Sequence, residues 1–148
     1  MERSDLIRKA VDAGALGRSS VGRIEDLVTS AFVHRFLTPD ERRARRAKTA
    51  VGTGIAPGGF RDIVFLYTIR SHLLVYDFLV ERYWPVVFSG HDSLRGEDIV
   101  LFIKDKEGTE RNPEGLTDKV TARVARSLGK TLTDFGFFED RRSPIRRI

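Results

Sequence analysis

The chain has 148 residues, a length that fits one domain or two small lobes. Apolar residues make up 41% of it and charged residues 32%, which excludes both a disordered chain and an integral membrane protein. Cysteine is absent, which excludes disulfide frameworks, thiolate zinc sites, iron–sulfur clusters and cysteine nucleophiles.

The first residues, MERSDLIRKA, contain no apolar stretch of signal-peptide length. The longest uncharged apolar run, residues 63–69, is far shorter than the roughly 20 residues that span a bilayer. We therefore expect a cytoplasmic protein with no membrane partner.

The formal net charge of +5 is unevenly distributed. Residues 1–50 carry +4, residues 51–110 carry −3, and residues 111–148 carry +4. Basic ends around an acidic middle are typical of proteins that approach a polyanion, most commonly nucleic acid. An ordinary solvated surface is the alternative explanation for charge alone.

In chain order, the apolar spacing first predicts a short N-terminal helix and then a longer helix from Ser20 to Phe36. The sequence TPDE follows at residues 38–41. It combines threonine at the cap, proline at the first helical position and glutamate three residues after the cap, which is a capping box. A third helix is therefore predicted from there to about Ala50.

This third helix is unusually basic. Its cations wrap most of the circumference and leave only a narrow apolar seam, so we expect the helix to lie on the surface. The cations are Arg42, Arg43, Arg45, Arg46 and Lys48. A glycine-rich connection follows at residues 52–59.

The most apolar part of the chain extends from Phe60 to Trp84. It predicts two core helices that meet near residues 71–72 and stop at Pro85, with Trp84 as a core anchor. A buried strand at residues 63–67 is the competing interpretation, because β-branched and aromatic residues also favour strands.

Residues 86–95 are predicted to form a loop, followed by a helix over residues 97–107. Thr117 caps a last long helix that ends near Gly136, and residues 137–148 form either a small hairpin or an extended basic tail. The predicted fold is all-α: a compact multi-helix bundle in one domain, 1–148, with possible sub-lobes at 1–51 and 58–148.

The last long helix carries the sharpest local signal. Four cations fall within an arc of about 60°, opposite the apolar positions of the helix. They are Lys119, Arg123, Arg126 and Lys130. Because like charges in one row repel, a structural helix would mix signs, whereas such a row suits a phosphate backbone. Arg141 and Arg142, and also Arg146 and Arg147, add cations downstream.

No motif indicates a catalytic or metal site. The three histidines lie far apart, the glycine-rich connection lacks the elements of a phosphate loop, and no nucleophile has a base beside it. We expect no metal, no cofactor, no small-molecule substrate and no catalytic activity.

Several segments resemble one family. Residues 73–85, LLVYDFLVERYWP, resemble the "LLYDF…WP" segment of the BrxA family of bacterial BREX phage-defence systems. Residues 96–103, GEDIVLFI, and residues 121–137, TARVARSLGKTLTDFGF, are similar to two later helices of that family. The order and spacing hold from about Gly14 to the end of the chain.

The resemblance implies an all-helical fold similar to the NusB antitermination proteins, binding to double-stranded DNA, and no catalytic activity. The charge geometry points to Lys119, Arg123, Arg126 and Lys130 as phosphate contacts, with Arg42–Arg46 and the tail as further contacts. RNA binding is one alternative, although the sequence indicates no exposed aromatic platform. A protein–protein adaptor that contacts other BREX subunits is the other.

Overall fold

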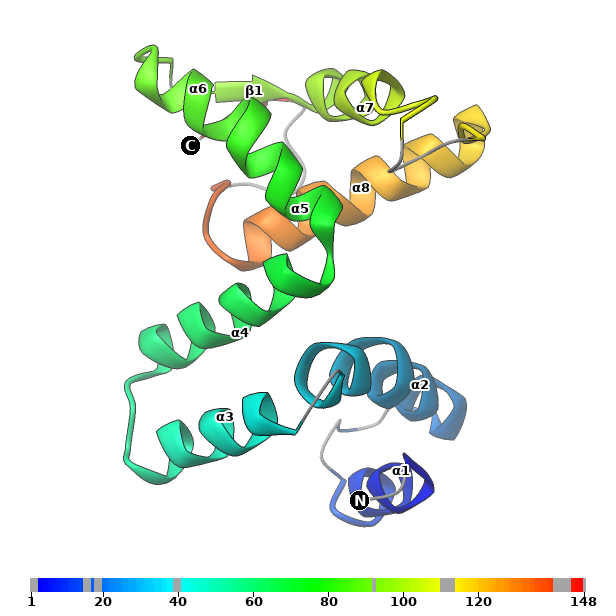
Figure 1. Ribbon diagram of the computed structural model, residues 1–148, viewed down its shortest axis with the longest axis vertical. Helices are drawn as coiled ribbons and strands as arrows, with labels where there is room; N and C mark the ends of the chain where they lie inside the picture. The colour runs from blue at the N-terminus through cyan, green and yellow to red at the C-terminus, as the bar shows by residue number, and fades with distance from the viewer. Residues whose placement is uncertain are drawn as a thin grey trace. The chain divides into compact units, whose positions relative to one another are not determined.

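The computed structural model describes residues 3–14, 17, 20–38, 41–91, 93–109, 114–139 and 145–147 (Figure 1). Seven continuous helices and two three-residue strands lie within these ranges, which confirms the predicted all-α class. The chain divides into two compact units, Met1–Ser71 and His72–Ile148.

The N-terminal unit consists of helices only. They are α1 (Arg3–Asp12), α2 (Val21–Asp26), the π-helix η1 (Leu27–Leu37), α3 (Arg42–Gly52) and α4 (Pro57–Ser71). The sequence predicts a division at residues 51–58, but α4 belongs to this unit because it packs against α3 and η1. Residues 63–67 lie within α4, so the competing prediction of a strand there is wrong.

Helices α2 and η1 form one continuous helix, as predicted from Ser20. The Ser20 hydroxyl caps it by accepting a hydrogen bond from the backbone N–H of Arg23 at 3.3 Å. Phe36, on the last turn of η1, meets Tyr67 of α4 edge to face, with ring centres 5.5 Å apart. This aromatic pair is buried and joins the two helices.

Helix α3 begins later than predicted. Its first residue is Arg42, Glu41 occupies the N-cap position, and no side chain caps it. Thr38 instead closes the preceding helix, where its hydroxyl donates to the carbonyl of Val33 at 3.4 Å. The predicted capping box is therefore wrong, while Pro39 and Asp40 within it lie outside the described residues. None of the α3 side chains is buried, so this is a surface helix as expected.

The C-terminal unit contains both strands. Its elements are α5 (Leu73–Phe78), the π-helix η2 (Leu79–Tyr83), α6 (Trp84–Phe88), β1 (Ser93–Arg95), α7 (Gly96–Asp105), α8 (Asp118–Asp134) and β2 (Ile145–Arg147).

The helix formed by α5, η2 and α6 is continuous and does not stop at Pro85 as predicted. A proline in a helix lacks the N–H donor, and its ring presses on the carbonyl of the fourth residue before it. Here the π segment η2 stands immediately before Trp84 and Pro85. The backbone N–H of Trp84 donates to the carbonyl of Leu79, five residues before it, as in a π turn, and the helix continues through Pro85 to Phe88.

Strands β1 and β2 pair antiparallel, with Leu94 opposite Arg146. Ser93–Arg95 was predicted as part of a loop, and that prediction is wrong. The end of the tail is extended, which was one of the two predicted alternatives. It pairs with β1 and not with a second strand of the tail. Leu94 is buried, which anchors the ladder to the unit.

The core of the C-terminal unit lies where α5, α7 and α8 meet. Phe78 and Phe102 are completely buried and contact each other edge to face, with ring centres 5.2 Å apart. Leu132 of α8 is also completely buried. The N-cap Thr117 accepts from the backbone N–H of Val120 at 3.4 Å, and Gly136, at φ +85°, turns the chain after α8.

In the part of the chain that the structure describes, no single helix is both long and apolar enough to cross a bilayer. Of the described helices, the bent pair Pro57–Ser71 and Leu73–Phe88 meets that criterion jointly, by length and composition alone.

The core position of Phe102 predicts a large stability loss on truncation. Phe102→Ala should lower the free energy of unfolding by about 3–5 kcal/mol, because it removes a fully buried ring and leaves a cavity. Its neighbour Leu101 is 57% exposed, so Leu101→Ala should change it by no more than about 0.5 kcal/mol. Urea unfolding of both variants measures the difference, and equal losses would contradict this core.

Candidate nucleic-acid interface

Helix α8 presents four cations on its solvent side. Their side chains are all exposed, and we call them the α8 basic row: Lys119, Arg123, Arg126 and Lys130. The buried positions of the same helix lie on its opposite side, at Thr121, Ala125, Leu128, Gly129 and Leu132. Both sets follow from one helical period, so burial of the apolar face determines where the cations point.

The partner of that apolar face is α7, which lies alongside α8 (Figure 1). Ile99, Phe102 and Ile103 of α7 are buried. Gly129 is among the buried positions of α8 as well. The orientation of α8 is thus fixed by apolar packing and not by its charges.

Within the described part of the chain, ion pairs do not neutralise the charge of the α8 basic row. Among the described residues, none of its four members makes an ion pair. Arg126 donates its Nε–H to the carbonyl of Ala122 at 3.3 Å, which leaves its terminal nitrogens available. Four exposed cations that form no ion pair with a described carboxylate make a positive strip, which favours a phosphate-bearing ligand.

An acidic residue does stand at the start of α8, but it is already paired. Lys104 of α7 donates to Asp118 at 2.8 Å. This hydrogen bond and the opposite charge lower the pKa of the Asp118 carboxyl and raise the pKa of the Lys104 ammonium. The negative charge of Asp118, next to Lys119, is therefore balanced by Lys104 of α7.

Helix α3 carries the second predicted cluster, in the N-terminal unit. Arg42, Arg45 and Arg46 are exposed, and Arg45 lies 3.9 Å from Glu41. Arg43 differs from them because it is half-buried. Its guanidinium lies 5.9 Å from the centre of the Tyr67 ring and donates to the carbonyl of Arg35 at 3.3 Å. Arg43 thus also has a structural role, because it links α3 to η1 and α4.

The predicted tail contacts are only partly placed. Arg141 and Arg142 lie outside the described residues. The backbone of Arg146 and Arg147 belongs to β2, beside β1.

Trp84, predicted as a core anchor, is 41% exposed, which corrects that prediction. Its ring stacks with that of Phe88, 82% exposed, at 5.8 Å between centres and 22° between planes. This exposed aromatic pair was not predicted, because the predicted helix ended at Pro85. Trp84 and Phe88 are four residues apart, a spacing that places two side chains on one face of a helix, and this spacing could have predicted the pair.

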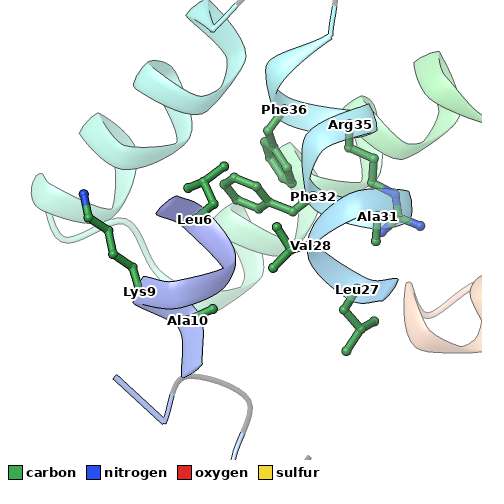
Figure 2. A pocket seen from close by; sticks show the side chains of 9 residues that line it. All are labelled: Leu6, Lys9, Ala10, Leu27, Val28, Ala31, Phe32, Arg35 and Phe36. Atoms are coloured by element: carbon green, nitrogen blue, oxygen red, sulfur yellow. The ribbon is translucent and has the colours of Figure 1, made fainter. Parts of the chain in front are cut away.

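A pocket of about 490 Å³ lies between α1 and η1 in the N-terminal unit (Figure 2). Leu6 of α1 and Phe32 of η1 point toward each other in it, and each helix adds one cation, Lys9 and Arg35. Burial lowers the pKa of the Arg35 guanidinium. Among the described residues, the lining of this pocket contains no carboxylate, hydroxyl or imidazole group that could transfer a proton near neutral pH.

The pairing of Lys104 with Asp118 predicts a measurable titration shift. Lys104→Met should return the depressed pKa of Asp118 toward that of an ordinary carboxyl. Because the folded-state pKa of Asp118 is the lower one, its ionised form stabilises the fold above the unfolded pKa, and this contribution is lost as pH falls through the folded pKa. A carboxyl NMR titration of both proteins checks this, and identical Asp118 curves would contradict the pairing.

Comparison with known proteins identifies the family of this chain. Neither the search of curated proteins nor the search of solved structures gives a match. The comparison with protein families matches BrxA over residues 1–148, the whole chain. The resemblance carried by residues 73–85, 96–103 and 121–137 is thereby confirmed, and the chain belongs to the BrxA family.

Proposed function

We propose that this protein is a non-enzymatic subunit of a bacterial BREX phage-defence system that binds double-stranded DNA through its phosphate backbone. Membership of the BrxA family indicates a BREX phage-defence protein. The observation that supports DNA as the ligand is the α8 basic row, whose four cations are exposed and without ion pairs among the described residues.

The dimensions of the row fit a nucleic-acid backbone. Lys119 and Lys130 are eleven residues apart, which corresponds to about 17 Å along a helix. One DNA strand carries a phosphate about every 3.4 Å along the duplex axis, so the row extends beside about five phosphates. Each phosphate that a lysine or arginine neutralises releases condensed counterions, and this release drives binding.

We assign little sequence specificity to this contact. Cations in one row along an exposed helix face match the regular spacing of phosphates and carry no information about bases. The exposed arginines of α3, and the tail arginines Arg141 and Arg142, are further phosphate contacts in this proposal. The non-enzymatic assignment rests on the sequence, which offers no nucleophile paired with a base and no metal-ligand spacing.

RNA binding is the second candidate, and one observation favours it. Trp84 and Phe88 are exposed aromatic residues, and proteins that bind single-stranded RNA stack bases on such rings. Competition of a labelled random DNA duplex with unlabelled duplex and with an RNA hairpin distinguishes the candidates. If DNA is the ligand, the unlabelled duplex should displace the labelled duplex at a lower concentration than the RNA hairpin does.

The α8 basic row predicts the effect of charge reversal. Arg123→Glu combined with Arg126→Glu should weaken binding to all duplex sequences alike and make the salt slope shallower by about 1.8, because two phosphate contacts are lost. The matched control is Arg61→Glu combined with Arg70→Glu, two exposed arginines of α4 with the same change in net charge. Gel-shift titrations at several salt concentrations provide both values.

If both double variants lose affinity equally, net charge and not the α8 basic row determines binding. If the α8 variant binds as the unmodified protein does, the proposed interface is wrong.

A further inference from the structure

The pocket between α1 and η1 in the N-terminal unit has no role in the proposed contact with DNA. Its volume of about 490 Å³ lies within the range of about 300–1,000 Å³ that is typical of small-molecule sites. Such sites are lined mainly by apolar side chains, with a few polar groups that orient the ligand. Of the nine described residues that line this pocket, seven are apolar and two are cations. The pocket therefore has the size and the composition of a ligand site.

Helix η1 forms one wall of the pocket. Three pairs of adjacent residues line it, at steps of four positions: 27–28, 31–32 and 35–36. This wall has the π form over 11 residues, whereas most π segments are single turns within α-helices and many of them lie at functional sites. Phe32 faces Leu6 across the pocket and is still 40% exposed, so its ring is accessible to a ligand (Figure 2).

The charged groups that line the pocket are positive, as far as the chain is described. Lys9 comes from α1 and Arg35 from η1. Asp5, one turn before Lys9, is already paired with Arg8 at 2.8 Å. Lys9 is exposed and makes no ion pair with any described residue. Its ammonium group therefore complements an anionic group of a ligand whose apolar part lies in the pocket.

We propose that this pocket binds a fatty carboxylate, with the alkyl chain between Leu6 and Phe32 and the carboxylate at Lys9. A methylene group is about as large as a water molecule, which occupies about 30 Å³, so the pocket has room for a chain of about twelve carbons. Transfer of that chain from water to the apolar walls drives binding. The proposal does not depend on the binding of DNA by the other unit.

An amphipathic helix of a partner protein is the other occupant that an apolar pocket could hold, and it fits this pocket less well. Recognition of a helix in a groove uses apolar anchors at positions i, i+3, i+4 and i+7, which extend over about two turns. A helix is about 10–12 Å wide, so a volume of 490 Å³ corresponds to only about one turn of it. A single alkyl chain matches the volume, and for that reason we favour it.

Isothermal titration calorimetry of the full chain with octanoate, decanoate and dodecanoate tests the proposal. The affinity should rise about fourfold for each methylene added to the chain, because each one removes a further apolar group from water. Decanol, the uncharged probe with the chain length of decanoate, should bind more weakly than decanoate because it makes no charge contact with Lys9. Absence of binding by all three carboxylates would overturn the proposal.

A filled pocket should not bind the chain. Ala31 lines the pocket, so Ala31→Trp should lower the affinity for dodecanoate by more than about tenfold, which equals the loss of roughly two buried methylenes. The matched control is Ala56→Trp, at an exposed alanine of the same unit outside the described lining, and it should bind as the unmodified protein does. Equal affinity of the two variants would show that the fatty carboxylate binds elsewhere and would overturn the proposal.

A surface variant tests the charge contact without any change in packing. Lys9→Glu should weaken the binding of decanoate by about fivefold, because an exposed charge contact is lost, and should leave the binding of decanol unchanged. Lys48→Glu is the matched control, since Lys48 is an exposed lysine of the same unit and the change in net charge is the same. If Lys9→Glu and Lys48→Glu bind decanoate equally well, Lys9 does not contact the carboxylate and the proposal is wrong.

Discussion

The burial of the apolar face of α8 against α7 determines where the cations of the C-terminal unit point. Leu128 and Leu132 are buried in the core of the C-terminal unit, and the helical period then leaves only one direction for the four cations. Like charges in a row repel one another by a few tenths of a kcal/mol per neighbouring pair. Burial of side chains such as Leu132 contributes about 1.5–3 kcal/mol each, so packing overcomes this repulsion.

Two surfaces of opposite character thus occur in the C-terminal unit. The α8 basic row is charged and without ion pairs among the described residues, while the exposed apolar side chains of Tyr76, Val80, Trp84 and Phe88 lie beside ion pairs that cancel. The first surface suits a polyanion, and the second suits an apolar ligand.

The sequence predicts the helices well where local signals agree. Helix α8 has a cap at Thr117, a regular apolar period and a glycine at its end, and all three are found in the structure. Prediction from the sequence fails where residues far apart in the chain determine the secondary structure. Strand β1 forms by pairing with residues about fifty positions away in the sequence. The helix that continues through Pro85 contains a π turn, which the pattern of side chains did not predict.

The salt dependence of binding by the unmodified protein shows whether the α8 basic row contacts DNA phosphates. The affinity for a random DNA duplex, measured at a series of salt concentrations, gives the slope of log K against log salt concentration. Four phosphate contacts from the α8 basic row predict a slope of about −3.6 or steeper. A slope near zero, or no binding at low salt, would contradict the account.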